Sequence, residues 1–204
     1  CSVRRQRQMC IRDSLYNDGQ GAGKRLFFGG GMALPSKNTI TSDPFFLSGE
    51  ERTEHRHFSI SEGAHKGILE LQYFKKRTTS PVFVGGSVTM ELPIGENKYG
   101  YQASNLYDAN INALSKKVSK INASIGGNLS VRHTSRAYWN GKAAPNSKST
   151  IISPGVSFLW NIKMGGIAIG LQKPTFVYGG MAGTEAEDVD EAISCLLYTS
   201  PSPR

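Results

Sequence analysis

Apolar and polar residues alternate for twelve positions over 121–132, Ile-Asn-Ala-Ser-Ile-Gly-Gly-Asn-Leu-Ser-Val-Arg. Successive side chains of a β-strand point to opposite faces, so such a strand has one apolar and one polar face. Its length exceeds the roughly 5–6 residues of an ordinary strand and suits the about 9–11 residues of a tilted membrane-crossing strand. A long surface strand of a soluble β-sandwich has the same pattern, so both interpretations stay open for this stretch alone.

The same alternation recurs along the chain and predicts seven strands. In the fourth, 106–115, a helical period also fits the apolar residues, but the neighbouring period-two strands favour a strand. The connections after the first, third, fifth and seventh strands are long, and those after the other three are short. The predicted strands are 24–34, 66–75, 82–92, 106–115, 121–132, 150–160 and 166–172.

This layout predicts an all-β fold, an up-and-down antiparallel transmembrane β-barrel that is incomplete, with about seven strands seen. Short turns at one end and long loops at the other are typical of outer-membrane barrels. Backbone groups in lipid must pair within the protein, so such a sheet has to close. A soluble lipocalin-like barrel turns its apolar face inward instead. The alternation by itself does not say which face is outside.

Three features favour lipid around the apolar face, and hence the outer membrane. The opposite face is polar on nearly every strand, as a wet lumen requires. The mean hydropathy is only −0.33 although every strand has an apolar face. Aromatic residues gather near strand ends, which resembles interfacial girdles. These aromatic residues are Tyr73 and Trp160 on the turn side, and Tyr107, Phe176 and Tyr178 on the loop side.

Strand parity fixes the face on which each side chain lies, so the preference for lipid around the apolar face can be tested. Ile125 and Val88 should point away from the concave side of the sheet, while Asn128 and Glu91 should lie on it. Near the bilayer midplane, Ile125→Arg should cost about 2–4 kcal/mol, and Asn128→Arg should be tolerated. The opposite arrangement would select the lipocalin-like barrel.

Charged residues on the polar face are the candidate lumen residues. Charges that line a pore act on permeating solutes and tune selectivity. Pairing and hydration of the lumen is an equally good account of the same residues. The candidates are Glu70, Glu91, Asp108 and Arg132.

Both ends of the chain resemble translated sequencing adapter. Residues 9–13, Met-Cys-Ile-Arg-Asp, and 195–200, Cys-Leu-Leu-Tyr-Thr-Ser, can be encoded by opposite strands of one DNA element, the transposase mosaic end. We therefore expect residues 1–14 and 195–204 to be disordered and residues 15–194 to be the barrel fragment. The natural chain is then expected to extend beyond both ends. A basic nucleic-acid-binding arm is the other interpretation of the N-terminus.

Setting these ends aside changes the composition. They hold five of the 24 Lys and Arg residues and one of the 16 acidic residues, so the formal net charge falls from +8 to +4. The electrostatic case for nucleic acid weakens accordingly, and we expect no such partner. All three cysteines lie in the ends, which leaves no disulfide, thiolate metal site or cysteine nucleophile between them. No apolar run approaches the ~20 residues of a membrane helix.

A histidine-rich loop, 35–64, is a candidate metal site. Imidazole and carboxylate groups are metal ligands, although the spacing matches no zinc signature. A hydrated loop with locally bonded histidines is the other interpretation. No Ser/His/acid set is evident, since His133-Thr134-Ser135 alone is no triad, so no enzyme activity or cofactor is predicted. The candidate ligands are His55, His57, His65 and Glu62.

Two late segments, Ser-Pro-Gly-Val at 153–156 and Ile-Ala-Ile-Gly-Leu-Gln-Lys-Pro at 167–174, carry a family resemblance. They resemble the late strands of outer-membrane transporters grouped with the MetA-pathway phenol-degradation proteins, over about twenty residues. The resemblance implies a barrel that conducts small compounds, apolar ones among them. Passage or uptake of a small-molecule solute is therefore the expected function. The alternatives are a structural or adhesive barrel that binds through its long loops, and a soluble lipocalin-like binding protein.

Overall fold

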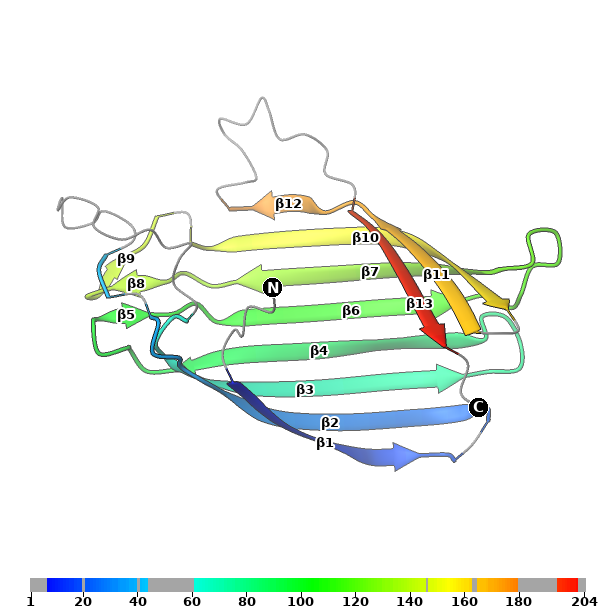
Figure 1. Cartoon of the computed structure of the whole chain (residues 1–204), viewed down its shortest axis with the longest axis horizontal. Helices are drawn as coiled ribbons and strands as arrows, with labels where there is room; N and C mark the ends of the chain where they lie inside the picture. The colour runs from blue at the N-terminus through cyan, green and yellow to red at the C-terminus, as the bar shows by residue number, and fades with distance from the viewer. Residues whose placement is uncertain are drawn as a thin grey trace, which may run out of the picture.

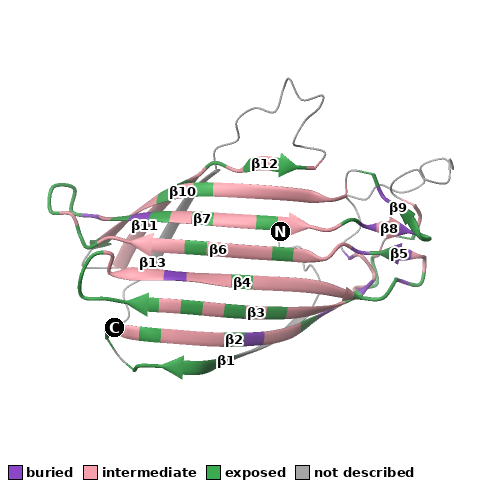
Figure 2. Cartoon of the chain, turned by 180° about the vertical axis from the view of Figure 1, so that it is seen from behind, coloured by how far each residue is buried: buried purple, intermediate pink, exposed green. Residues whose placement is uncertain are grey.

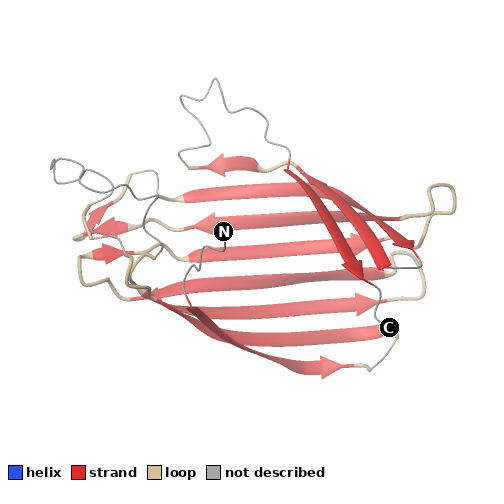
Figure 3. Ribbon diagram, viewed as in Figure 1, coloured by secondary structure: helices blue, strands red, loops and turns tan. Residues whose placement is uncertain are grey.

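A computed structural model describes residues 7–19, 21–39, 41–43, 61–145, 147–162, 165–179 and 194–201. The described residues form β-strands and loops without a helix (Figure 3). None of them therefore belongs to a helix that could cross a bilayer. The strands of the main sheet are β1 Arg7–Asn17, β2 Gly23–Leu34, β3 His65–Lys76, β4 Phe83–Ile94, β6 Leu106–Leu114, β7 Ser124–Thr134, β10 Ser149–Ile162, β11 Gly165–Gln172, β12 Thr175–Tyr178 and β13 Ser194–Pro201. Three two-residue strands lie in loops, β5 Tyr101–Gln102, β8 Tyr138–Trp139 and β9 Lys142–Ala143.

The main sheet is an antiparallel up-and-down meander, as the alternation of loop lengths predicted. Its order is β1-β2-β3-β4-β6-β7-β10-β11-β13, with β12 beside β10. The sheet curls at one side, where β11 and β13 cross in front of the central strands in Figure 1 and behind them in Figure 2. No pairing between described residues joins β1 to β13, so no closed barrel is detected and the sheet has two edges, whereas the sequence predicted an incomplete barrel.

The fourth predicted strand is β6, not a helix, and the fifth begins later than its pattern indicated. Asn122 has a left-handed backbone with φ of 56°, and an antiparallel bridge joins Val118 to Ala123. This turn holds Ile121 and Asn122, so the strand runs from Ser124 to Thr134. Alternation at Ile121 and Asn122 was therefore misleading, because asparagine tolerates the left-handed conformation that a tight turn requires.

Two prolines explain why β10 changes its partner along its length. Residues Gly155–Ile162 of β10 pair with β11, whereas Thr150–Ile152 pair with β12. Pro154 and Pro174 lie at the junction, where a proline has no N–H to donate to the ladder. The carbonyl of Pro154 instead accepts a hydrogen bond from the backbone N–H of Lys173 at 3.0 Å.

The two ends differ from the disorder expected of them. β1 pairs with β2 and β13 pairs with β11, both antiparallel. A sheet edge presents unpaired N–H and C=O groups that an adjacent extended segment can satisfy whatever its side chains. Backbone pairing therefore accounts for these strands without side-chain selection, and the adapter origin of the ends stays a prediction.

The register assigns every central strand one apolar and one polar face. Leu71, Val88, Ala109 and Val131 are cross-strand partners in one row of the apolar face. The apolar face is the exposed one: Ile111 is 62% exposed. The other exposed apolar side chains on this face are Phe28, Met32, Leu69, Leu71, Tyr73, Val88, Tyr107, Ile125, Leu129, Val156 and Leu171.

Most of the buried apolar residues lie in the loops, and Ala33 of β2 is the one in a strand of the main sheet among the described residues. The segments 95–105 and 135–145, which we call the loop cap, pack together at the end of the sheet opposite the short turns (Figure 2). In the cap, Tyr101 is 1% exposed and Trp139 is 7% exposed, with their ring centroids 6.0 Å apart. Among the described residues, five of the eight buried apolar residues belong to the cap, so the sheet itself lacks an apolar core.

Candidate functional site: the polar face of the sheet

Three of the four predicted lumen residues lie in one row across the polar face. Glu70 of β3 pairs with Thr89 of β4, Thr89 with Asp108 of β6, and Asp108 with Arg132 of β7. The Nε of Arg132 donates to Oδ2 of Asp108 at 2.9 Å. The row therefore carries a cross-strand ion pair, with the Glu70 carboxylate two strands away from Asp108.

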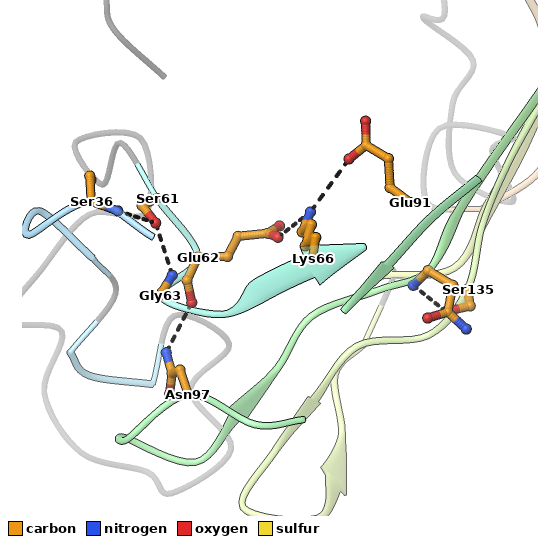
Figure 4. A network of polar contacts seen from close by, with 9 residues as sticks. Ser36, Ser61, Glu62, Gly63, Lys66, Glu91, Asn97 and Ser135 are labelled. Atoms are coloured by element: carbon orange, nitrogen blue, oxygen red, sulfur yellow. Dashed lines mark hydrogen bonds and ion pairs between the residues drawn. The ribbon is translucent and has the colours of Figure 1, made fainter. Parts of the chain in front are cut away.

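Glu91 lies one row closer to the long loops, where sequence reasoning missed its partner. The ammonium of Lys66 is 2.6 Å from Oε2 of Glu62 and 3.9 Å from Oε2 of Glu91 (Figure 4). Lys66 has the same parity as Glu70 in β3, so the period-two rule could have identified it. The four predicted lumen residues and Lys66 thus lie in the half of the sheet next to the long loops.

Toward the short turns the polar face is hollowed. A cavity of about 410 Å³ lies across β4, β6, β7, β10 and β11, on the inside of the curl. None of the described residues that line it is charged. Its hydrogen-bonding side chains are Asn110, Asn112, Asn128, Ser130, Ser157 and Gln172.

Glycines make room for the larger side chains around this hollow. A Cβ atom at Gly155 would lie 2.6 Å from Oδ1 of Asn128 and 2.7 Å from Cγ of Gln172. A Cβ at Gly85 would lie 2.3 Å from the ring of Phe74. These glycines are therefore required for close approach, a common role of glycine inside a strand.

An aromatic cluster borders the hollow on the β2–β4 side. The rings of Phe74 and Phe83 stack with their centroids 5.5 Å apart, and Phe27 lies 6.3 Å from Phe74. Phe83 also lines the hollow. The polar face therefore offers a charged row, a set of carboxamides and hydroxyls, and an aromatic border, an arrangement suited to binding a solute.

The long loops next to the charged row are tied together by polar side chains. The buried Asn97 donates from Nδ2 to the carbonyl of Glu62 at 3.0 Å (Figure 4). Its Oδ1 accepts hydrogen bonds from the backbone N–H groups of Tyr99 and Tyr101. The backbone N–H of Asn105 donates to Oγ of Ser135, in the loop after β7, at 2.9 Å. Hydrogen bonds of the Asn97 and Ser135 side chains thus tie three loops together at the mouth of the polar face.

Among the described residues, no group of three or more His, Cys, Asp or Glu side chains could hold a metal ion. Glu62 pairs with Lys66, and His65 is exposed at the start of β3. His55 and His57 lie outside the described residues. The metal site in loop 35–64 therefore stays a prediction.

Of the five aromatic residues predicted to form a girdle, three are exposed and Trp160 is half-buried, and the girdle itself stays a prediction. Tyr73, Tyr107 and Tyr178 are exposed. The register places Phe176 opposite Ile151, on the polar face, because a register shift lies between Thr150 and Ile151. A bulge reverses strand parity locally, which the pattern alone did not reveal.

Comparison with protein-family profiles, curated proteins and solved structures gave no match to the chain.

Proposed function

We propose that the sheet is part of the wall of an outer-membrane β-barrel, with lipid against its apolar face and a solute passage along its polar face. One observation carries the proposal. The sheets of soluble proteins bury their apolar face, whereas here the apolar face is exposed and the polar face is hollowed. Water penalises an apolar surface of this extent, and monomeric soluble proteins rarely expose one. Lipid makes the same surface favourable.

The charged row is the proposed selective part of the passage. Asp108 and Arg132 form an ion pair, and Glu70 lies in the same row. Charges at a pore wall favour or repel permeating ions according to sign. The resemblance of segments 153–156 and 167–174 to outer-membrane transporters agrees with passage of a small solute and is part of this proposal.

The orientation in lipid is tested by fluorescence quenching. The three cysteines are first replaced in Cys1→Ser, Cys10→Ser and Cys195→Ser, and single cysteines are then introduced as Ile111→Cys or Thr89→Cys. After bimane labelling in phosphatidylcholine vesicles, we expect brominated lipid to quench the label at 111 and aqueous iodide to quench the label at 89.

Passage is tested with the full chain in two ways. Conductance is measured across a planar phosphatidylcholine bilayer, and solute-induced swelling is measured in phosphatidylcholine vesicles. We expect discrete conductance steps and swelling that empty vesicles lack. Iodide quenching at both positions, or a chain that stays in solution without lipid or detergent, would overturn the membrane proposal in favour of a soluble binding protein.

The loop cap favours a second candidate function, binding through the long loops of a barrel that conducts nothing. Its packed core, built on Tyr101 and Trp139, holds the loops in one arrangement, as a binding surface requires. Lipid quenching at position 111 without conductance or swelling would select this candidate.

A further inference from the structure

Most of the hydrogen-bonding side chains that line the hollow on the polar face have no hydrogen-bond partner among the described residues. Asn110 donates from Nδ2 to Oγ of Ser87 at 2.6 Å. The other side chains of this type in the lining make no hydrogen bond to another described residue. These are Asn112, Asn128, Ser130, Ser157 and Gln172. All five are half-buried.

Half-buried polar groups without a protein partner require water or a ligand. A carboxamide both donates and accepts hydrogen bonds, and so does a hydroxyl. Leaving such a group unpaired away from water costs roughly 1–3 kcal/mol. The matching ligand therefore carries several groups that both donate and accept.

The lining disfavours two other classes of solute. An ion that left water for this hollow would lose hydration without meeting an opposite charge, because the nearest charged row is already engaged around Asp108 and Arg132. A purely apolar solute would leave the amides of Asn112, Asn128 and Gln172 unpaired. A neutral solute rich in hydroxyl groups avoids both costs.

The border and the size of the hollow suit the same class. Phe83 lines one side and stacks on Phe74, which gives a flat apolar surface beside the polar groups. A sugar ring has both a C–H face and a rim of hydroxyls. The volume of about 410 Å³ falls in the range of roughly 300–1,000 Å³ that small-molecule sites occupy.

We propose that the hollow binds a neutral, hydroxyl-rich solute of about the size of a monosaccharide, through the carboxamides of Asn112, Asn128 and Gln172. A role of this hollow in transport rests on the proposed function. The assignment names a substrate class narrower than passage alone and different from the apolar compounds that the transporter resemblance implies.

Binding is measured by saturation-transfer NMR with the full chain in detergent micelles. The probes are D-glucose, D-glucuronate and cyclohexanol, which share a six-membered ring and differ in charge and hydroxyl content. We expect glucose to bind and the other two to bind at least about fivefold more weakly, the effect of one lost hydrogen bond of ~1 kcal/mol.

Variants test the residues. Asn128→Leu and Gln172→Leu should each weaken glucose binding about fivefold. The matched control is Gln102→Leu, the same type of change at an exposed residue of β5 outside the hollow, which should leave binding unchanged. If Asn128→Leu does not fold, as judged by circular dichroism, Asn128→Asp keeps the size of the side chain and adds a negative charge, so it should raise the binding of protonated D-glucosamine relative to glucose.

The outcomes separate this inference from the proposed function. No binding of glucose, equal binding of the three probes, or glucose binding that neither Asn128 variant alters would overturn the sugar-binding hollow, whether or not vesicles conduct. Glucose binding that the variants weaken, in a chain that gives no vesicle swelling with glucose, would retain the hollow and overturn passage.

Discussion

Ile111 and its chain neighbour Asn110 show at the residue scale how the two faces differ. Ile111 points away from the sheet with 62% of its surface exposed, whereas Asn110 lines the hollow and donates to Ser87. In water, the exposure of Ile111 costs free energy, and the hydrogen bond of Asn110 adds little stability. In lipid, the exposure of Ile111 becomes favourable, because burial of apolar surface is worth roughly 25 cal/mol per Å².

This contrast predicts the effect of a charge on each face. Ile111→Arg should lower the free energy of unfolding in phosphatidylcholine vesicles by about 2–4 kcal/mol, because Ile111 lies in the middle of β6. Gln72→Arg, on the polar face beside Glu70, is the control and should be tolerated. Urea titrations followed by tryptophan fluorescence measure both. Equal losses for the two variants would contradict the assignment of the faces.

Ile125 is a weaker site for the same test than its place in the pattern suggested. It pairs with Phe158 at the short-turn end of β7, close to the turn that contains Asn122. A charge near the interface costs only about 0–1 kcal/mol. We therefore expect Ile125→Arg to destabilise less than Ile111→Arg in the same titration.

Asp18, in the turn between β1 and β2, makes that turn sensitive to pH. A hydrogen bond from the Tyr16 hydroxyl, and then one from the backbone N–H of Lys24, hold the pKa of Asp18 below its usual 3.8. A lowered folded-state pKa means that the stabilisation is present above 3.8 and is lost as pH falls through the folded value. The protection factor of the Lys24 amide, which is the intrinsic exchange rate divided by the measured rate at the same pH, should fall only below pH 3.8 when measured by NMR on acidification. Asp18→Asn should remove this dependence, and a fall in the protection factor that survives in this variant would contradict the assignment.

At the scale of elements, the loop cap should behave as a unit separate from the sheet. Its core is small and is built on two large side chains, Tyr101 and Trp139, so Trp139→Ala should destabilise the cap by about 3–5 kcal/mol, the usual cost of removing a buried tryptophan. Hydrogen exchange should then speed up at Tyr101 and Ala144 and stay unchanged in β6. Tyr138→Ala, at the neighbouring half-buried residue, is the control and should have a smaller effect. Loss of protection throughout β6 would show that the cap and the sheet unfold together.

Sequence patterns predicted the sheet better than the cap for a physical reason. Period-two alternation is a local property, so the seven strands and the shared row of Glu70, Asp108 and Arg132 follow from parity and short turns. The cap joins residues from separate loops, and no local pattern indicates that Tyr101 meets Trp139. The early turn at Asn122 was missed because its residues happen to continue the alternation.

At the scale of the whole molecule, the two edges of the sheet are formed by the two ends of the chain. β1 and β13 supply backbone partners to β2 and β11, and an unpaired edge is a template for association. The interior pairs from β3 to β10 do not involve either end.

Deleting residues 1–14 and 195–204 should therefore leave the interior strands intact. We expect unchanged amide protection in β4, β6 and β7 in detergent micelles, together with concentration-dependent association as β2 and β11 become edges. Analytical ultracentrifugation measures the association. A general loss of protection would show that the ends are structural parts of the fold.

The cap also has a consequence for the order of folding. Its ties connect residues far apart along the chain: Asn97 and the carbonyl of Glu62 are separated by 35 residues, and Asn105 and Ser135 by 30. Loop-closure entropy delays contacts of such separation until the hairpins between them have formed. Side chains of the cap should thus have φ-values near zero, and weakening them should speed unfolding while leaving the folding rate unchanged. The loops that meet last would then govern the lifetime of the folded molecule.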